Sequence, residues 1–118
     1  MIKGIGVDLI DLERINQSIS RNPRMVQRIL TDNEQQFFNK LKGQRQIEFF
    51  AGRFAAKEAF SKAAGTGIGR LSFHDIEILP DSNGAPQMKV NGYESYNIWI
   101  AISHSQHQAI AQVILEEV

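Results

Sequence analysis

Hydrophobic and polar residues alternate along the first ten positions, and this period of two predicts a β-strand over residues 2–10. The apolar face of the strand carries Ile5, Val7 and Leu9. The opposite face carries Gly4, Gly6 and Asp8. Glycine weakens a strand, so two glycines on one face indicate that another group approaches the strand closely there. Asp8 is then predicted to lie beside this cleared surface.

Three helical segments are predicted between residues 11 and 42. Asp11 has the chemistry to cap the first of them. Asn22 and Pro23 restart the chain, as the N-cap and the first residue of a second, short amphipathic helix. Thr31 and Glu34 have the spacing of a capping box, and they precede a third apolar-periodic segment.

The strongest helical signal runs from residue 44 to residue 64, where apolar residues are spaced for one buried stripe. The glycine-rich segment 65–69 ends it. The hydrophobic period then changes to two, which predicts a hairpin of strands 76–79 and 87–90 and two final strands at 98–102 and 109–115. The order of elements predicts an α+β fold, with the N-terminal strand and the helices packed on a mainly antiparallel sheet and one long central helix.

Length and composition predict a single domain over residues 1–118. The hydrophobic share of 42% is typical of a soluble globular protein, and no apolar run is long enough for a transmembrane helix, so no membrane association is expected. The N-terminus does not have the pattern of a secretory signal. The chain contains no cysteine, which excludes disulfides and thiolate metal sites and suits a cytoplasmic protein.

The formal net charge is zero, which argues against a nucleic-acid-binding protein. Charge is nevertheless uneven along the chain, because the segment 12–30 carries one acidic residue and four arginines: Arg14, Arg21, Arg24 and Arg28. A basic patch on a neutral protein indicates a local acidic partner or ligand.

Asp8 and Glu58 are the strongest candidates for chemistry, because each is a carboxylate within an otherwise apolar element. Burying an ionised carboxylate is costly unless it is paired or bound to a cation. Hard oxygen ligands suit Mg²⁺, so the two residues predict a magnesium site in an enzyme that acts on phosphates. Two alternatives stay open from the residues alone: Asp8 as a helix cap, and Glu58 in a surface ion pair with Lys62 four residues along the helix.

Other polar clusters are less specific. Ser61 and Lys62 project near Glu58 on the predicted helix. The segment 103–105, with a histidine between two serines, suits either a phosphate or a plain polar turn, and nothing in the spacing establishes a hydrolytic triad. Arg45 and Arg53 are either phosphate ligands or solvated surface charges. The glycine-rich segment follows a helix, which favours a helix end over a phosphate-binding loop.

Four stretches in combination resemble the holo-(acyl-carrier-protein) synthases, a family of 4'-phosphopantetheinyl transferases. These stretches are Gly4-Ile5-Gly6-Val7-Asp8, the segment 52–63 around Lys57-Glu58, Gly65-Thr66-Gly67-Ile68-Gly69, and Ile102-Ser103-His104-Ser105. The resemblance covers the chain in order and at similar spacing. It implies the phosphopantetheinyl transferase fold and the transfer of 4'-phosphopantetheine from coenzyme A to a serine of acyl carrier protein, leaving adenosine 3',5'-bisphosphate.

The resemblance also implies roles for individual residues. Asp8 and Glu58 would hold Mg²⁺ against the pyrophosphate, and Lys62 would neutralise or protonate the departing phosphate. The proton of the attacking hydroxyl goes to Glu58 or to a metal-polarised water, and this choice stays open. The residues expected to contact the coenzyme, some from a neighbouring subunit, are Arg45, Arg53, Ser61, Lys62, Asn83, Gly84, Pro86, Ser103, His104 and Ser105.

The same resemblance implies two protein partners. The first is the acidic acyl carrier protein, docked on Arg14, Arg21, Arg24, Met25 and Arg28. The second is the chain itself, in a homotrimer with active sites at the subunit interfaces.

Two alternatives compete with this interpretation. A non-catalytic module that binds carrier proteins would keep the arginines but would need neither Asp8 nor Glu58. A phosphopantetheinyl transferase of broader specificity is commonly about twice this length through internal duplication, whereas this chain holds one copy.

Overall fold

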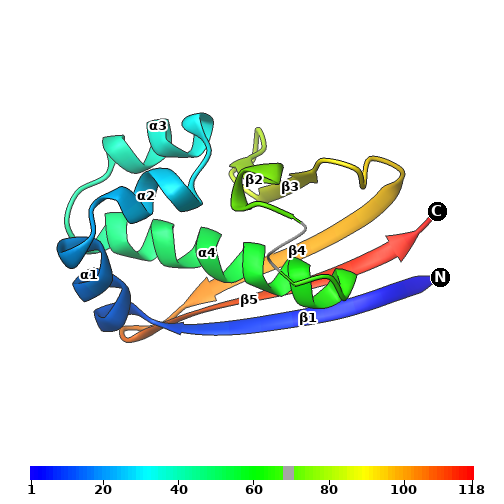
Figure 1. Ribbon diagram of the computed structural model, residues 1–118, viewed down its shortest axis with the longest axis horizontal. Coiled ribbons are helices and arrows are strands. Elements are labelled where there is room, and N and C mark those ends of the chain that lie inside the picture. Colours follow the sequence, from blue (N-terminus) through cyan, green and yellow to red (C-terminus); the bar gives the residue numbers. More distant parts are fainter. Residues whose placement is uncertain (68–70) are drawn as a thin grey trace.

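The computed structural model describes residues 1–67 and 71–118, so the last part of the glycine-rich segment, including Gly69, lies outside the described residues. Figure 1 shows the long helix α4 lying across one face of a curved sheet, with the smaller helices gathered at one end. The helices are α1 (Leu12–Arg21), α2 (Arg24–Ile29), α3 (Asp32–Lys40), α4 (Gln44–Ala64) and the 3₁₀ turn η1 (Phe73–Asp75). The strands are β1 (Ile2–Asp11), β2 (Ile76–Pro80), β3 (Pro86–Val90), β4 (Tyr96–His104) and β5 (Gln108–Glu117).

The strands form two antiparallel sheets. The larger has the order β1-β5-β4, so the first strand of the chain pairs with the last, and Asp8 lies opposite Ala111. The smaller is the β2–β3 hairpin. The predicted α+β fold is therefore confirmed. β4 and β5 both extend beyond their predicted bounds, because their ladder continues from Tyr96 opposite Glu117 to His104 opposite Ala109.

The backbones of α4 and β1 are packed too closely for side chains to fit between them at two positions. A Cβ atom placed on Gly6 would lie 1.8 Å from the carbonyl oxygen of Ala59, and one on Gly4 would lie 1.8 Å from that of Ala63. The group that approaches the glycine face of β1 is thus the backbone of α4. Only glycine leaves room for this contact. The contact places the next residue on the same face, Asp8, beside α4.

Local capping signals explain three of the helix ends. Asp11 accepts a hydrogen bond from the Arg14 amide at 3.1 Å and caps α1, as predicted. Thr31 and Glu34 form the predicted capping box of α3. Gly65 ends α4 in the left-handed conformation with φ of 74°, the helix end expected for it.

The predicted start of α2 is wrong by one position. Asn22 is the C-cap of α1, and Pro23 is the N-cap of α2 without a side-chain hydrogen bond. The Asn22 amide is used by the preceding helix, since it donates to the Ser18 carbonyl at 2.9 Å. The two basic helices therefore meet at a tight junction.

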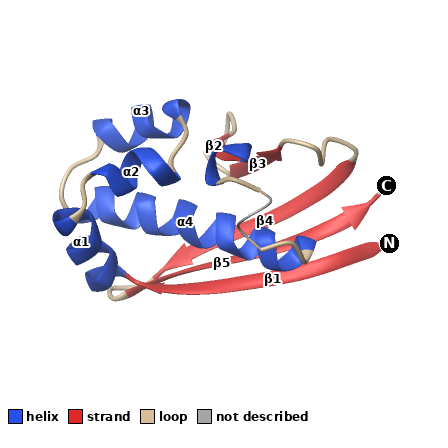
Figure 2. Ribbon diagram, viewed as in Figure 1, coloured by secondary structure: helices blue, strands red, loops and turns tan. Residues whose placement is uncertain are grey.

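The face of the larger sheet away from α4 is apolar and exposed. Ile5, Val7 and Leu9 of β1 are exposed by 58%, 50% and 56%, because the glycine side of the strand, and not its apolar side, packs against α4. Ile110 of β5 and Trp99 of β4 are also exposed, by 41% and 59%. No helix of the described residues covers this face (Figure 2). We call these five side chains the outer sheet face.

Among the described residues, no helix has both the length and the apolar composition needed to cross a membrane.

Candidate active site

Asp8 and Lys62 form an ion pair between β1 and α4. The Lys62 ammonium donates to Asp8 Oδ1 at 2.9 Å and to the carbonyl of Val7 at 3.0 Å. The Asp8 side chain is only 19% exposed, whereas that of Lys62 is 53% exposed. Among the described residues, Lys62 thus forms its ion pair with Asp8. The alternative that Glu58 pairs with Lys62 along the helix is wrong.

Glu58 lies one helical turn before Lys62 and completes the cluster. Partial burial raises the pKa of Glu58, and the nearby Asp8 charge raises it further, while Lys62 partly opposes the shift. Like charges at close range repel, so the ionised form of Glu58 carries an electrostatic cost beside Asp8. The fold therefore brings together the residues that the sequence singled out, and it leaves a net negative charge among them.

The three side chains fit a bound magnesium ion. Two carboxylates supply hard oxygen ligands, and Mg²⁺ characteristically takes one or two carboxylates, several waters and substrate phosphates. With Lys62 positive, the cluster carries a net charge of about −1, and a divalent cation brings it to about +1, which suits a pyrophosphate. No third potential ligand from His, Asp or Glu joins Asp8 and Glu58 within the described residues, so the protein supplies only part of any coordination shell.

The segment 103–105 lies at the C-terminal end of β4. Ser103 is in register with Ile110, which in turn is in register with Leu9, so this serine borders the outer sheet face. His104 has its Nδ1 atom 3.8 Å from Glu48 Oε2 of α4. A hollow of about 250 Å³ here is lined by Leu9, Ser103, His104, Ser105, Gln108 and Ile110. In the described residues, no hydrogen bond links this segment to Asp8, Glu58 or Lys62 of the same chain.

Ser61, Arg45 and Arg53 lie on other sides of α4. The Ser61 hydroxyl is buried at 2% exposure and donates to the Glu58 carbonyl at 2.7 Å, so it serves its own helix. Arg45 is exposed in the first turn. The Arg53 guanidinium lies 4.1 Å above the Phe49 ring, where burial lowers its pKa.

Asn83, Gly84 and Pro86 lie at the tip of the β2–β3 hairpin. The Asn83 amide donates to Asp81 Oδ1 at 2.8 Å, and Gly84 takes a φ of +84° in the turn. The hairpin lies over α4 in Figure 1, and its strand β2 is held to α3 by the Ile78 amide, which donates to Glu34 Oε2 at 2.8 Å.

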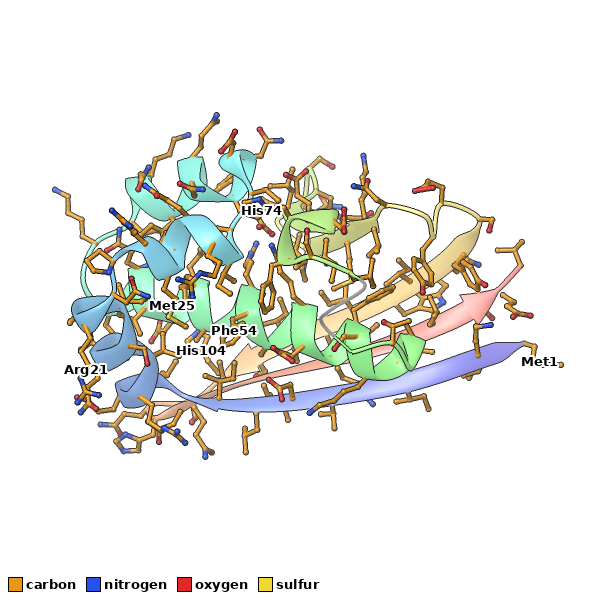
Figure 3. All side chains as sticks on the ribbon, in the orientation of Figure 1. Met1, Arg21, Met25, Phe54, His74 and His104 are labelled. Carbon is orange, nitrogen blue, oxygen red and sulfur yellow. The ribbon has the colours of Figure 1, made fainter. Side chains whose placement is uncertain are left out.

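The predicted carrier-docking residues spread over α1 and α2. Their four arginines are exposed: Arg14, Arg21, Arg24 and Arg28. Met25 is half-buried between them, and Figure 3 shows Arg21 and Met25 at the same end of the molecule. None of the salt bridges within the described residues involves these arginines. Their charges are therefore free to meet an acidic surface.

Sequence reasoning missed the buried pair of Lys57 and Glu34. Both side chains are fully buried, and the Lys57 ammonium donates to Glu34 Oε1 at 2.7 Å. A signal was present, because Lys57 lies seven residues after Phe50 and three before Phe60, both of which are fully buried. A lysine on such a stripe indicates a buried partner.

Comparison with known proteins identifies the family of this chain. The family model of the 4'-phosphopantetheinyl transferase superfamily matches residues 4–114. A holo-(acyl-carrier-protein) synthase of Oceanobacillus iheyensis is 55% identical over 116 residues, which span 98% of this chain and 98% of that protein. One of Listeria monocytogenes is 51% identical over 117 residues, 98% of this chain and 99% of the relative.

Solved structures point the same way. The crystal structure of a holo-(acyl-carrier-protein) synthase from Bacillus anthracis, in complex with CoA (3',5'-ADP), superposes with a TM-score of 0.93 at 48% identity. The match covers 100% of this chain and 99% of that one. The chain therefore belongs to the 4'-phosphopantetheinyl transferase superfamily, among its holo-(acyl-carrier-protein) synthases.

Proposed function

We propose that this chain transfers the 4'-phosphopantetheine group of coenzyme A to a serine of apo acyl carrier protein, with Mg²⁺ held by Asp8 and Glu58. The observation that carries the proposal is the cluster of Asp8, Glu58 and Lys62 between β1 and α4. The same cluster argues against a non-catalytic carrier-binding module, which gains nothing from a half-buried Glu58 whose pKa is raised by burial and by a second carboxylate, Asp8. Residues 1–118 then form one catalytic domain, and this domain acts in the cytoplasm.

The transfer is a phosphoryl-type displacement, so charge develops on the oxygens of the phosphate that departs. When bound, Mg²⁺ would neutralise charge on the two phosphates of the coenzyme A pyrophosphate. Lys62 is exposed enough to move from Asp8 toward a bound phosphate, and its ammonium neutralises or protonates the leaving group. The attacking serine hydroxyl would lose its proton to Glu58 or to a water polarised by the metal, and both would lie at this same cluster.

The exposed arginines of α1 and α2 give the carrier protein a docking surface. An acidic partner gains long-range attraction from unpaired basic side chains, which mainly raises the rate of encounter. Met25 and Val26 are half-buried beside them and add apolar contact. The docking surface is defined here as Arg14, Arg21, Arg24, Met25 and Arg28.

The proposed homotrimer uses the outer sheet face. Monomeric proteins seldom leave a contiguous apolar patch of several large side chains in water. Ser103 borders this face, in register with Ile110. Packing of copies through the outer sheet face therefore brings the segment 103–105 of one copy toward another copy. That arrangement supports a coenzyme site built from two subunits, with Arg45, Arg53, Asn83, Gly84 and Pro86 as further candidate contacts.

The activity itself is tested with apo acyl carrier protein, coenzyme A and Mg²⁺, followed by mass spectrometry. We expect the carrier to gain the mass of phosphopantetheine and EDTA to abolish the gain. Asp8→Asn and Glu58→Gln should each lower kcat/KM by about 100-fold or more, since a metal supplies several kcal/mol. Asp11→Asn is the matched control, because asparagine caps α1 equally well. A fully active Asp8→Asn/Glu58→Gln double variant contradicts the metal assignment.

The raised pKa of Glu58 has a consequence for stability without metal. The folded state disfavours the ionised carboxylate, so wild-type stability falls as the pH rises from the ordinary glutamate range through the raised pKa. In EDTA, Glu58→Gln should therefore have a larger free energy of unfolding than wild type at pH 7. The difference should disappear below the ordinary glutamate pKa. Urea unfolding at both pH values measures it, and Glu13→Gln should change stability by less than about 0.5 kcal/mol.

The docking surface predicts a salt-dependent KM for the carrier. This KM should rise between about 50 mM and about 500 mM salt, because ions screen exposed charges. Arg24→Glu should raise it by about tenfold at low salt through like-charge repulsion. Lys89→Glu places the same charge change on exposed β3 and should leave it unchanged. A carrier KM that is flat with salt and equal in both variants argues against this surface.

The homotrimer predicts that a charge on the outer sheet face separates the copies. Val7→Glu should sediment as a folded monomer and lose most activity, since Val7 is half-exposed in the single chain. Gln36→Glu, which adds the same charge on exposed α3, should remain trimeric and active. A monomeric and active wild-type protein contradicts the trimer.

A further inference from the structure

A buried ammonium joins three separate segments to the central helix. Lys57 Nζ donates to the Ile29 carbonyl at 2.7 Å, to Glu34 Oε1 at 2.7 Å and to the Phe73 carbonyl at 3.1 Å. An ammonium has three protons, so every donor of Lys57 is used. These acceptors belong to the end of α2, to α3 and to η1.

Glu34 is equally well satisfied. Its Oε1 atom also accepts from the Thr31 amide at 2.9 Å, and its Oε2 atom accepts from the Ile78 amide of β2 at 2.8 Å. A fully buried charge is tolerated only when it is paired and hydrogen-bonded in this way. The Lys57–Glu34 pair therefore connects α2, α3, α4, η1 and β2 at one point.

The short helix α2 depends on such contacts. It has six residues, too few to be stable alone, and it carries Arg24, Met25 and Arg28 of the docking surface. Within the described residues, the Lys57–Ile29 bond is the one hydrogen bond between α2 and α4. The positive charge lies at the C-terminal end of α2, where a helix dipole favours a cation. A second hydrogen bond joins His74 Nε2 of η1 to the Gln27 carbonyl of α2 at 2.7 Å.

Lys57 and Glu58 are consecutive on α4, so their side chains leave the helix about 100° apart. One reaches α2, where the carrier protein docks in our proposal, and the other faces Asp8 on β1. A single rigid turn of helix thus connects the docking surface with the metal-binding pair.

We infer that Lys57, oriented by Glu34, is a positioning residue that holds α2 at a fixed place relative to Glu58, so that a docked carrier presents its serine to the reacting phosphate. This inference rests on the proposed function. The pair touches neither coenzyme nor carrier; it acts through α2. Misplacement of a docking element by about 1 Å is enough to weaken productive binding considerably.

Steady-state kinetics of the full-length chain tests the inference. Lys57→Met keeps an unbranched side chain one atom shorter and removes all three donors. We expect the KM for the carrier to rise by about tenfold or more, with the KM for coenzyme A and kcat at saturating carrier within about threefold of wild type. Lys57→Arg restores charge and donors and should recover part of the carrier KM.

A matched control separates positioning from loss of stability. Leu115→Ala truncates a fully buried side chain near the C-terminal end of β5, which belongs to a different apolar cluster from the described residues of α2. It should lower the melting temperature without a selective effect on the carrier KM. If Lys57→Met does not fold, Glu34→Gln takes its place, because it keeps an acceptor oxygen and loses the charge that orients Lys57.

The outcomes are distinct. A carrier-selective rise in KM in the Lys57 or Glu34 variant, absent from Leu115→Ala, supports the inference. An unchanged carrier KM, or equal losses for carrier and coenzyme in both kinds of variant, overturns it while wild-type transfer stands. If wild type transfers no phosphopantetheine to the carrier, the proposed function fails, and the inference fails with it.

Discussion

The rest of the molecule depends on the contact between the backbone of α4 and the glycine face of β1. A side chain at Gly4 or Gly6 would overlap a carbonyl of α4, so the helix lies as close to this strand as two backbones allow. Alanines at 55, 59 and 63 keep the helix equally close to the sheet. This closeness brings side chains of α4 within reach of Asp8. A larger distance between the helix and the sheet would keep them apart.

The charges collected at that contact are not arranged for stability. Lys62 satisfies one carboxylate, while burial and Asp8 leave Glu58 in an environment that disfavours its ionised form. The pair of Lys57 and Glu34 shows the opposite design, because every donor and acceptor there has a partner. The two lysines of α4 thus belong to ion pairs of different kinds. The Lys57–Glu34 pair is fully buried and has all its hydrogen bonds within the protein. The Asp8–Lys62 pair is partly exposed to solvent, which suits the cation and phosphate of the proposed function.

The outer sheet face follows from the same constraint. Because the glycine side of β1 is taken by α4, the apolar side of the strand must face outward. In a single chain the exposed apolar side chains raise the free energy of the folded protein in water. In the proposed assembly it becomes the contact that surrounds the active site with a second copy. The fold therefore links tight packing on one face of β1 with the exposed apolar surface on the other, which the proposed association would cover.

Short-range patterns in the sequence determined the helices and strands, the caps at Asp11, Thr31 and Gly65, and the candidate carboxylates, since these depend on residues a few positions apart. The four motifs in combination indicated the family. The tertiary structure alone decided that Lys62 pairs with Asp8, 54 residues away, and not with its helical neighbour Glu58. It also decided that Lys57 is buried and that the apolar side of β1 faces solvent. The reason is physical: alternation defines two faces of a strand, but only the packing of a distant helix selects which face is covered.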